Sequence, residues 1–235
     1  MRILIIDQCS GSKDVPESAP KFDAADIDEH GREALLARDG VPAIPARRLY
    51  AGRQQRYIDS AVDRLRATGD TVDRMYISAG FGLVDEETEL PPYEVTFGDM
   101  DPEAIDERAV RLVISADVRE AIQVEPPYDV VILALGGDYY RSCELEAVID
   151  ALPRETYGVV FNHEELASGR PRVVSIPART VEAKEHGTIV VALKGRYLQN
   201  FARHRKEGAT VNEIADIVEY CTTEPTTQTG FGEFG

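Results

Sequence analysis

Short apolar segments rich in β-branched residues alternate with stretches of helical periodicity along this chain, and this alternation most limits its fold. Strands are expected at 2–7, 72–78, 129–135, 158–162 and 188–192. Helices are expected at 26–38, 46–68, 102–123, 144–152, 180–185, 195–206 and 210–220. Strands that alternate with helices predict an α/β fold, in which helices flank a mostly parallel sheet.

The end of the chain differs from the rest. Thr210 is expected to cap the last helix, with Glu213 at capping-box spacing. Residues 222–235 are rich in Thr, Gly and Glu and poor in aliphatic side chains, which predicts a flexible tail. Because no repeat or long linker divides the remainder, we expect one α/β domain over 1–221.

The charge balance is strongly acidic. The formal net charge is −16, and only five of the 26 basic residues are lysines. Acidic excess with few lysines resembles proteins of salt-loving archaea, so the acidity says little about the substrate, even though acidic surfaces repel phosphate. No apolar run approaches the roughly 20 residues of a membrane-spanning helix, and no signal-peptide pattern occurs. We therefore expect a soluble, cytoplasmic protein with no membrane partner.

Cysteine and histidine are sparse and scattered. The three cysteines and four histidines lie far apart, without the spacing of a zinc site or a disulfide framework. We therefore expect neither a metal nor another cofactor.

Small-residue segments follow three of the expected strands, at 9–13, 78–82 and 136–141. Ligands of parallel sheets bind beyond the carboxyl ends of the strands, so these segments are expected to form one site. The substrate contacts expected there come from Cys9, Ser10, Ser12, Ser78, Gly80, Gly82, Gly136 and Tyr140. Glycine at a strand end is equally explained by a turn, and this alternative stays open.

Charged residues near these segments suit catalysis. Lys13 is expected to hold a phosphate or, if buried, to act as an amine nucleophile. Glu94, in a constrained segment after a proline and Tyr93, is the preferred acid or base. Tyr93 is expected to offer a stacking face, with packing in the core as the alternative. Asp138 and Asp7 are further candidate carboxylates. A helix N-cap explains Asp138, and a turn explains Asp7, without chemistry.

Two stretches concentrate basic residues, at 46–66 and 194–206. Arg48 lies beside Tyr50, and arginine interleaved with an aromatic ring suits stacked bases. The expected nucleic-acid contacts are Arg53, Arg56, Lys194, Arg196 and Arg203. Pairing of these residues with neighbouring carboxylates is the alternative.

Four motifs carry a family resemblance. They are Cys9-Ser10-x-x-Lys13, Pro45-Ala46-x-x-Leu49-Tyr50-x-Gly52, Ile77-Ser78-Ala79-Gly80-Phe81-Gly82-Leu83-Val84 and Pro91-Pro92-Tyr93-Glu94. In this order, over roughly residues 1–145, they resemble the YaaA-related proteins. The resemblance implies a three-layer α/β arrangement like that of YaaA and uracil-DNA glycosylase, with a basic cleft that handles DNA or nucleobases. The first motif also resembles that of archaeosine synthase, which modifies a tRNA base, with Gln8 where that motif has proline.

Taken together, these features predict a protein that binds nucleic acid, either DNA or tRNA, or a nucleotide. The favoured activity is that of a nucleobase glycosidase or transferase, in which a carboxylate positions water or stabilises an oxocarbenium-like centre. Two alternatives stay open: a DNA-binding stress-response protein without turnover, and a binder of free nucleotides.

Overall fold

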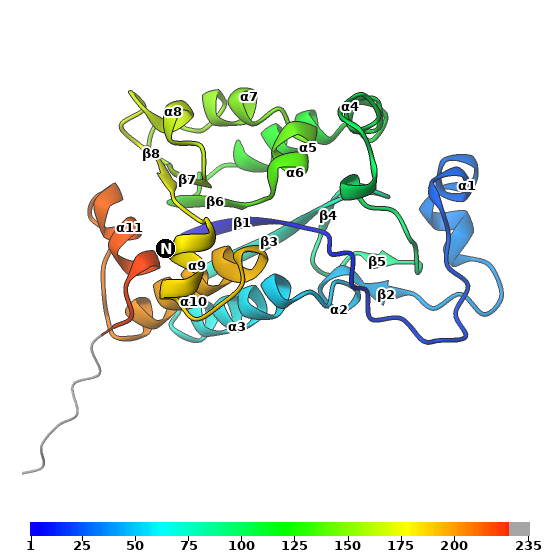
Figure 1. Ribbon diagram of the computed structural model, residues 1–235, viewed down its shortest axis with the longest axis horizontal. Coiled ribbons are helices and arrows are strands. Elements are labelled where there is room, and N and C mark those ends of the chain that lie inside the picture. Colours follow the sequence, from blue (N-terminus) through cyan, green and yellow to red (C-terminus); the bar gives the residue numbers. More distant parts are fainter. Residues whose placement is uncertain (226–235) are drawn as a thin grey trace, which may run out of the picture.

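The computed structural model of the protein describes residues 1–225. Its fold is mixed α/β, with a six-stranded, mostly parallel sheet flanked by helices, as the sequence predicts (Figure 1). The strand order is β4-β3-β1-β6-β7-β8, and β4 pairs antiparallel with β3 at one edge. These strands are β1 (Arg2–Gln8), β3 (Thr71–Ser78), β4 (Gly82–Asp85), β6 (Val130–Ala134), β7 (Tyr157–Phe161) and β8 (Val173–Ile176).

Helices form a layer on each face of the sheet (Figure 1). One layer consists of α3 (Arg53–Ala67), α9 (Thr180–Glu185), α10 (Val190–Lys206) and α11 (Ile214–Thr222). The other contains α4 (Pro102–Arg111), α5 (Ile114–Ile122), α6 (Gly137–Ser142), α7 (Leu145–Asp150) and α8 (Glu164–Ala167).

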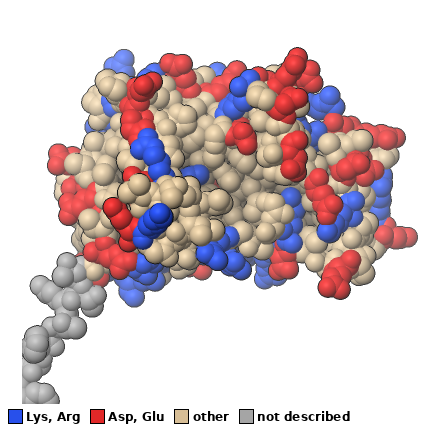
Figure 2. All heavy atoms as spheres, in the orientation of Figure 1, with Lys and Arg blue, Asp and Glu red and all other residues tan. Residues whose placement is uncertain are grey.

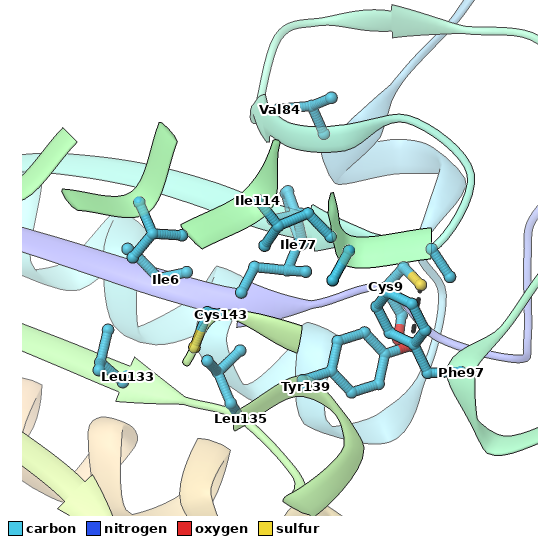
Figure 3. Close-up of a cluster of buried hydrophobic side chains, with 14 of the residues drawn as sticks. Ile6, Cys9, Ile77, Val84, Phe97, Ile114, Leu133, Leu135, Tyr139 and Cys143 are labelled. Carbon is cyan, nitrogen blue, oxygen red and sulfur yellow. Dashed lines mark hydrogen bonds between the residues drawn. The ribbon is translucent and has the colours of Figure 1, made fainter. Parts of the chain in front are cut away.

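Strand β1 shows why the sheet is buried on both faces. Its residues alternate, so that Ile3 and Ile5 join the apolar cluster under α3 and α10, while Leu4 and Ile6 join the cluster under α4–α7. Figure 3 shows the second cluster, in which Ile6, Ile77 and Leu133 of three neighbouring strands lie close together. A continuous apolar run is therefore the expected sequence of such a strand.

Beyond the carboxyl ends of β1 and β6 lies a smaller subdomain, at the right of Figure 1. It contains α1 (Ala24–Leu36), α2 (Ala46–Leu49), a two-stranded sheet of β2 (Ile44–Pro45) and β5 (Glu89–Leu90), and a 3₁₀ turn at Phe97–Asp99. Ile27, Leu35 and Leu49 join the main apolar cluster, so this subdomain packs on the end of the sheet.

Several predicted elements are wrong in type or extent. Residues 188–192 form no strand, because α10 begins at Val190. Val190 and Val191 are exposed on this helix, whereas Leu193 is buried. The edge strand of the sheet is β8 instead. The predicted helix at 46–68 breaks after Leu49, where Tyr50 is extended. The predicted helix at 102–123 breaks at Val113, whose φ is 55°.

The chain end also differs from expectation. Thr210 does not cap α11: Glu213 is the N-cap and forms a capping box with Asp216. Thr222, the first residue of the expected tail, is the last residue of α11, and 226–235 lie outside the described residues. None of the helices within 1–225 combines the length and apolar character that a membrane span requires.

Candidate functional site

The three small-residue segments lie at one edge of the sheet. Strands β3, β1 and β6 are parallel neighbours, with Gln8 opposite Ile77 and Asp7 opposite Ala134. The segments that follow these strands therefore leave the sheet side by side, facing the subdomain of α1, α2 and β2–β5 (Figure 1).

A polar groove of about 630 Å³ opens at this end of the molecule. Its charged side chains are Lys13, Lys21, Glu94 and Asp99, and Gly11, Ser12, Tyr93 and Thr96 also line it. The structure thus places Lys13 and Glu94, far apart in sequence, in one groove. The groove thus contains amines that can bind an anion and carboxylates that can act as a base.

Tyr93 holds Lys13 at the groove. The Nζ atom of Lys13 lies 4.3 Å from the centroid of the Tyr93 ring, a cation–π contact. The Tyr93 hydroxyl lies 2.8 Å from both the Tyr50 hydroxyl and the Ser78 Oγ. The ring is only 1% exposed, because Phe81 packs edge-on and a Cβ at Gly80 would lie 2.9 Å from it. The expectation that Tyr93 offers a stacking face is therefore wrong.

The pKa values of two charged groups in the groove, Lys13 and Glu94, are lowered. Burial lowers the pKa of Lys13, although the negative forms of Cys9 and Glu94 act in the opposite direction. A hydrogen bond from Lys21, with a Nζ–Oε1 distance of 2.5 Å, lowers the pKa of Glu94. Glu94 is 64% exposed and ionised at neutral pH, so it suits the role of base and not that of acid.

In the segment 9–13, which follows β1, several backbone N–H groups have no acceptor within the described residues. Within the described residues, the N–H groups of Gly11, Ser12 and Lys13 donate no hydrogen bond to the protein, while Ser12 O accepts from Ala51 N and from the Ser10 hydroxyl. Successive unpaired N–H groups beside a lysine are typical of anion-binding loops.

Other predicted contacts are buried and already paired. The Cys9 Sγ lies 3.0 Å from the Tyr139 hydroxyl, next to Phe97 (Figure 3). The Tyr140 hydroxyl donates to Leu133 O and accepts from Phe161 N, so Tyr140 ties β6 to β7 and does not line the groove of Lys13.

The glycines and Asp138 lie outside the groove. Gly82, with φ of 74°, starts β4, and Gly136 N donates to the Gln8 side chain. Asp138 is exposed in the first turn of α6, but the N-cap of that helix is Gly136, so the N-cap alternative for Asp138 is wrong. The grouping of Asp138 with Lys13 and Glu94 is therefore wrong, since Asp138 does not line their groove.

Asp7 belongs to a buried polar cluster that the sequence analysis missed. Its Oδ2 lies 2.9 Å from Arg74 Nη2, and its Oδ1 accepts from Gln54 at 2.7 Å. Arg74 also pairs with Asp59. With these partners Asp7 is structural. The sequence signal that could have revealed this cluster is Arg74. It is a charged residue at an inward-facing position of β3, where alternate residues Val72 and Tyr76 are also buried.

The two basic stretches differ in the structure. Arg48, Arg53 and Arg56 are exposed and pair with no side chain of 1–225, in contrast to Arg47 and Arg66, which pair with Glu87 and Glu86. Figure 2 shows basic side chains over α2 and α3, whereas acidic ones gather over α1 and α4.

The second stretch is no open basic surface. Arg196 and Arg203 both pair with Glu224, the latter at 3.7 Å. Lys194 is buried, so its predicted role as a nucleic-acid contact is wrong.

Comparison of the chain with protein-family models, curated proteins and solved structures gave no match. Within residues 1–225, no three His, Cys, Asp or Glu side chains group as metal ligands would.

Proposed function

We propose that this protein binds a nucleotide, free or within a nucleic acid, through a phosphate held at Lys13. The observation that carries the proposal is the loop Gly11–Lys13: its residues line the groove together with the Lys13 amine, and within residues 1–225 its backbone N–H groups donate no hydrogen bond. Lys21, whose amine pairs with Glu94, also lines the groove. Backbone donors together with amines are the usual partners of phosphate oxygens.

Nucleic acid, rather than a free nucleotide, is favoured by the exposed arginines. The backbone of Ser12–Asp14 pairs with that of Leu49–Ala51, through hydrogen bonds of 3.1 Å and 2.8 Å. The groove loop is therefore continuous with α2 and the start of α3, which present Arg48, Arg53 and Arg56. A strand bound at Lys13 would meet these guanidinium groups along its phosphates.

Glu94 supports the catalytic form of the proposal, a nucleobase glycosidase or transferase. It is an ionised carboxylate in the groove that contains Lys13, so it would orient a water or other nucleophile towards the sugar C1′ of a nucleotide held there. In this scheme Lys13 holds the phosphate, and Glu94, paired with Lys21, acts as the base.

Binding is tested by fluorescence anisotropy with single-stranded DNA, tRNA and a mononucleotide. We expect Lys13→Ala to weaken nucleic-acid binding about 10- to 100-fold, since a charge-assisted hydrogen bond contributes about 1.5–3 kcal/mol. Lys184→Ala, at an exposed lysine on α9, is the matched control and should bind as the wild type does. Equal binding by both variants would overturn the phosphate site. A shallow salt dependence would favour the mononucleotide.

Turnover is tested separately, by mass spectrometry of bases and nucleosides released from DNA or tRNA. Wild-type protein should release or modify a base, and Glu94→Gln should lose that activity while it retains binding. Intact nucleic acid after incubation with wild-type protein would remove the catalytic form and leave a DNA-binding protein without turnover.

A further inference from the structure

The groove that contains Lys13 also contains a carboxylate without a partner. Asp99 lines this groove and is exposed. Among residues 1–225 its carboxylate accepts no hydrogen bond and forms no ion pair, with Lys13 or with any other side chain, whereas Glu94 pairs with Lys21. Within the described part of the chain, Asp99 is therefore the uncompensated carboxylate of the groove.

The backbone around Asp99 is anchored in the core. Asp99 is the last residue of the 3₁₀ turn Phe97–Asp99, whose N-cap is the Thr96 hydroxyl. Phe97 is fully buried, and its ring packs edge-on against that of Tyr139 at a centroid distance of 5.1 Å (Figure 3). The carboxylate therefore projects from a fixed position on the wall of the groove and not from a free loop.

Asp99 and Lys13 can contact one ligand. Both line the same groove of about 630 Å³, a volume within the range of sites for small molecules. Burial lowers the pKa of Lys13, and the charge of Asp99 is among those that act in the opposite direction. A nucleotide whose phosphate is held at Lys13 would therefore also meet the carboxylate of Asp99.

An unpaired carboxylate disfavours phosphate binding unless the ligand itself supplies donors. The charge of Asp99 repels a phosphate bound nearby and so opposes the attraction of Lys13. A carboxylate accepts hydrogen bonds and donates none, so it attracts N–H groups and repels carbonyl oxygens. Cytosine presents an amino group at C4, where thymine and uracil present a carbonyl. The ring N–H of uracil lies between two carbonyl oxygens, which repel a carboxylate that approaches it.

We propose that Asp99 selects the base of the bound nucleotide, and that the groove takes a base with an exocyclic amino group, such as cytosine, in preference to uracil. The amino group donates to the Asp99 carboxylate, while a phosphate of the same strand is held at Lys13. This inference rests on the proposed phosphate site. It supplies a specificity that the phosphate site lacks, because phosphate contacts carry no sequence information.

The alternative role for Asp99 is solvation, as for other exposed carboxylates of this acidic chain. A carboxylate that only faces water treats cytosine and uracil alike, because it meets neither base. It would still repel the phosphates of both strands to the same extent. The two roles therefore differ in the ratio of two affinities.

The test compares oligo-dC and oligo-dU of equal length by fluorescence anisotropy. The two strands carry the same phosphates and present one base in every register. We expect the wild type to bind oligo-dC at least about fivefold more tightly than oligo-dU. Asp99→Asn should bring the two affinities within about twofold of each other, because an amide offers a donor as well as an acceptor.

Two further variants separate the possible outcomes. Asp39→Asn removes the same charge from an exposed carboxylate that does not line the groove, and it should retain the wild-type ratio. Lys13→Ala should weaken the binding of both strands by the same factor and leave the ratio unchanged. Equal affinities in the wild type, tighter binding of oligo-dU, or a ratio that Asp99→Asn retains would overturn the role of Asp99.

Failure of this inference can be told from failure of the phosphate site. Binding that depends on Lys13 but not on the base overturns the role of Asp99 alone. If neither strand binds, the phosphate site fails and the role of Asp99 fails with it.

Discussion

At the scale of single residues, the Tyr93 hydroxyl connects the groove to the core. It lies between two buried hydroxyls, those of Tyr50 and Ser78, and the Ser78 Oγ accepts in turn from the backbone N–H groups of Gly80 and Phe81. The ring that contacts Lys13 is therefore fixed by bonds to two other elements.

Tyr93→Phe should lower the free energy of unfolding by about 1–2 kcal/mol, because the buried Tyr50 hydroxyl loses its partner. The ring remains, so binding of nucleic acid at Lys13 should be unchanged. Urea denaturation and anisotropy measure the two effects. Tyr157→Phe is the control: its hydroxyl donates to Asn212 O at 3.2 Å in an exposed position, and its loss should stay within about 0.5 kcal/mol. Equal losses in both variants would contradict this account.

Sequence patterns located the residues of the groove better than they assigned roles. Lys13 and Glu94 were predictable because one follows an apolar strand and the other a Pro-Tyr pair. The roles of Tyr93 and Asp7 were not, since each depends on partners from distant segments: Gly80 and Phe81 cover the ring, and Arg74 holds the carboxylate.

At the scale of elements, α3 and α10 pack against each other in the layer that also contains α9 and α11. Their approach depends on Gly195, where an added Cβ would lie 2.7 Å from Gln54 O and 2.8 Å from Tyr57 Cβ. The same contact places Gln54 and Lys194 under the end of β6.

Gly195→Ala should destabilise the protein by about 1–2 kcal/mol, because overpacking against backbone outweighs the gain of about 1 kcal/mol in helix propensity. Gly137→Ala is the matched control at another helical glycine, where a Cβ would meet nothing within 4 Å. That variant should equal or exceed wild-type stability. The prediction is wrong if thermal unfolding shows Gly195→Ala to be as stable as Gly137→Ala.

Element type was predictable wherever apolar periodicity was strong, as in β1, β3, β6 and β7. The pattern failed at 188–192, where exposed Val190 and Val191 follow Ile189 at a helix start and mimic a strand. It also missed the breaks at Tyr50 and Val113, because backbone dihedral angles there depend on packing that propensity does not encode.

At the scale of the whole molecule, buried amines make the free energy of unfolding depend on pH in the alkaline range. Burial lowers the pKa of Lys194 from 10.5 to about 8 and also lowers that of Lys13. The unfolded chain therefore binds more protons than the folded one between these values, and the free energy of unfolding rises with pH across that window. Burial raises the pKa of Tyr50 and Tyr93, so the tyrosines oppose the rise only near pH 10 and above.

Wild-type protein should accordingly gain about 1–2 kcal/mol of stability between pH 8 and 9.5, given about 1.4 kcal/mol for each pKa unit. Lys194→Met has no amine to deprotonate, so it should be more stable than the wild type at pH 7.5 and should lose most of the rise. Urea denaturation at pH 7.5, 8.5 and 9.5 measures both. Lys184→Met, at an exposed lysine, should retain the wild-type profile. If the free energy of unfolding changes with pH in the same way in the wild type and in Lys194→Met, the prediction is wrong. The Lys194 amine would then stay charged in the folded protein across this pH range.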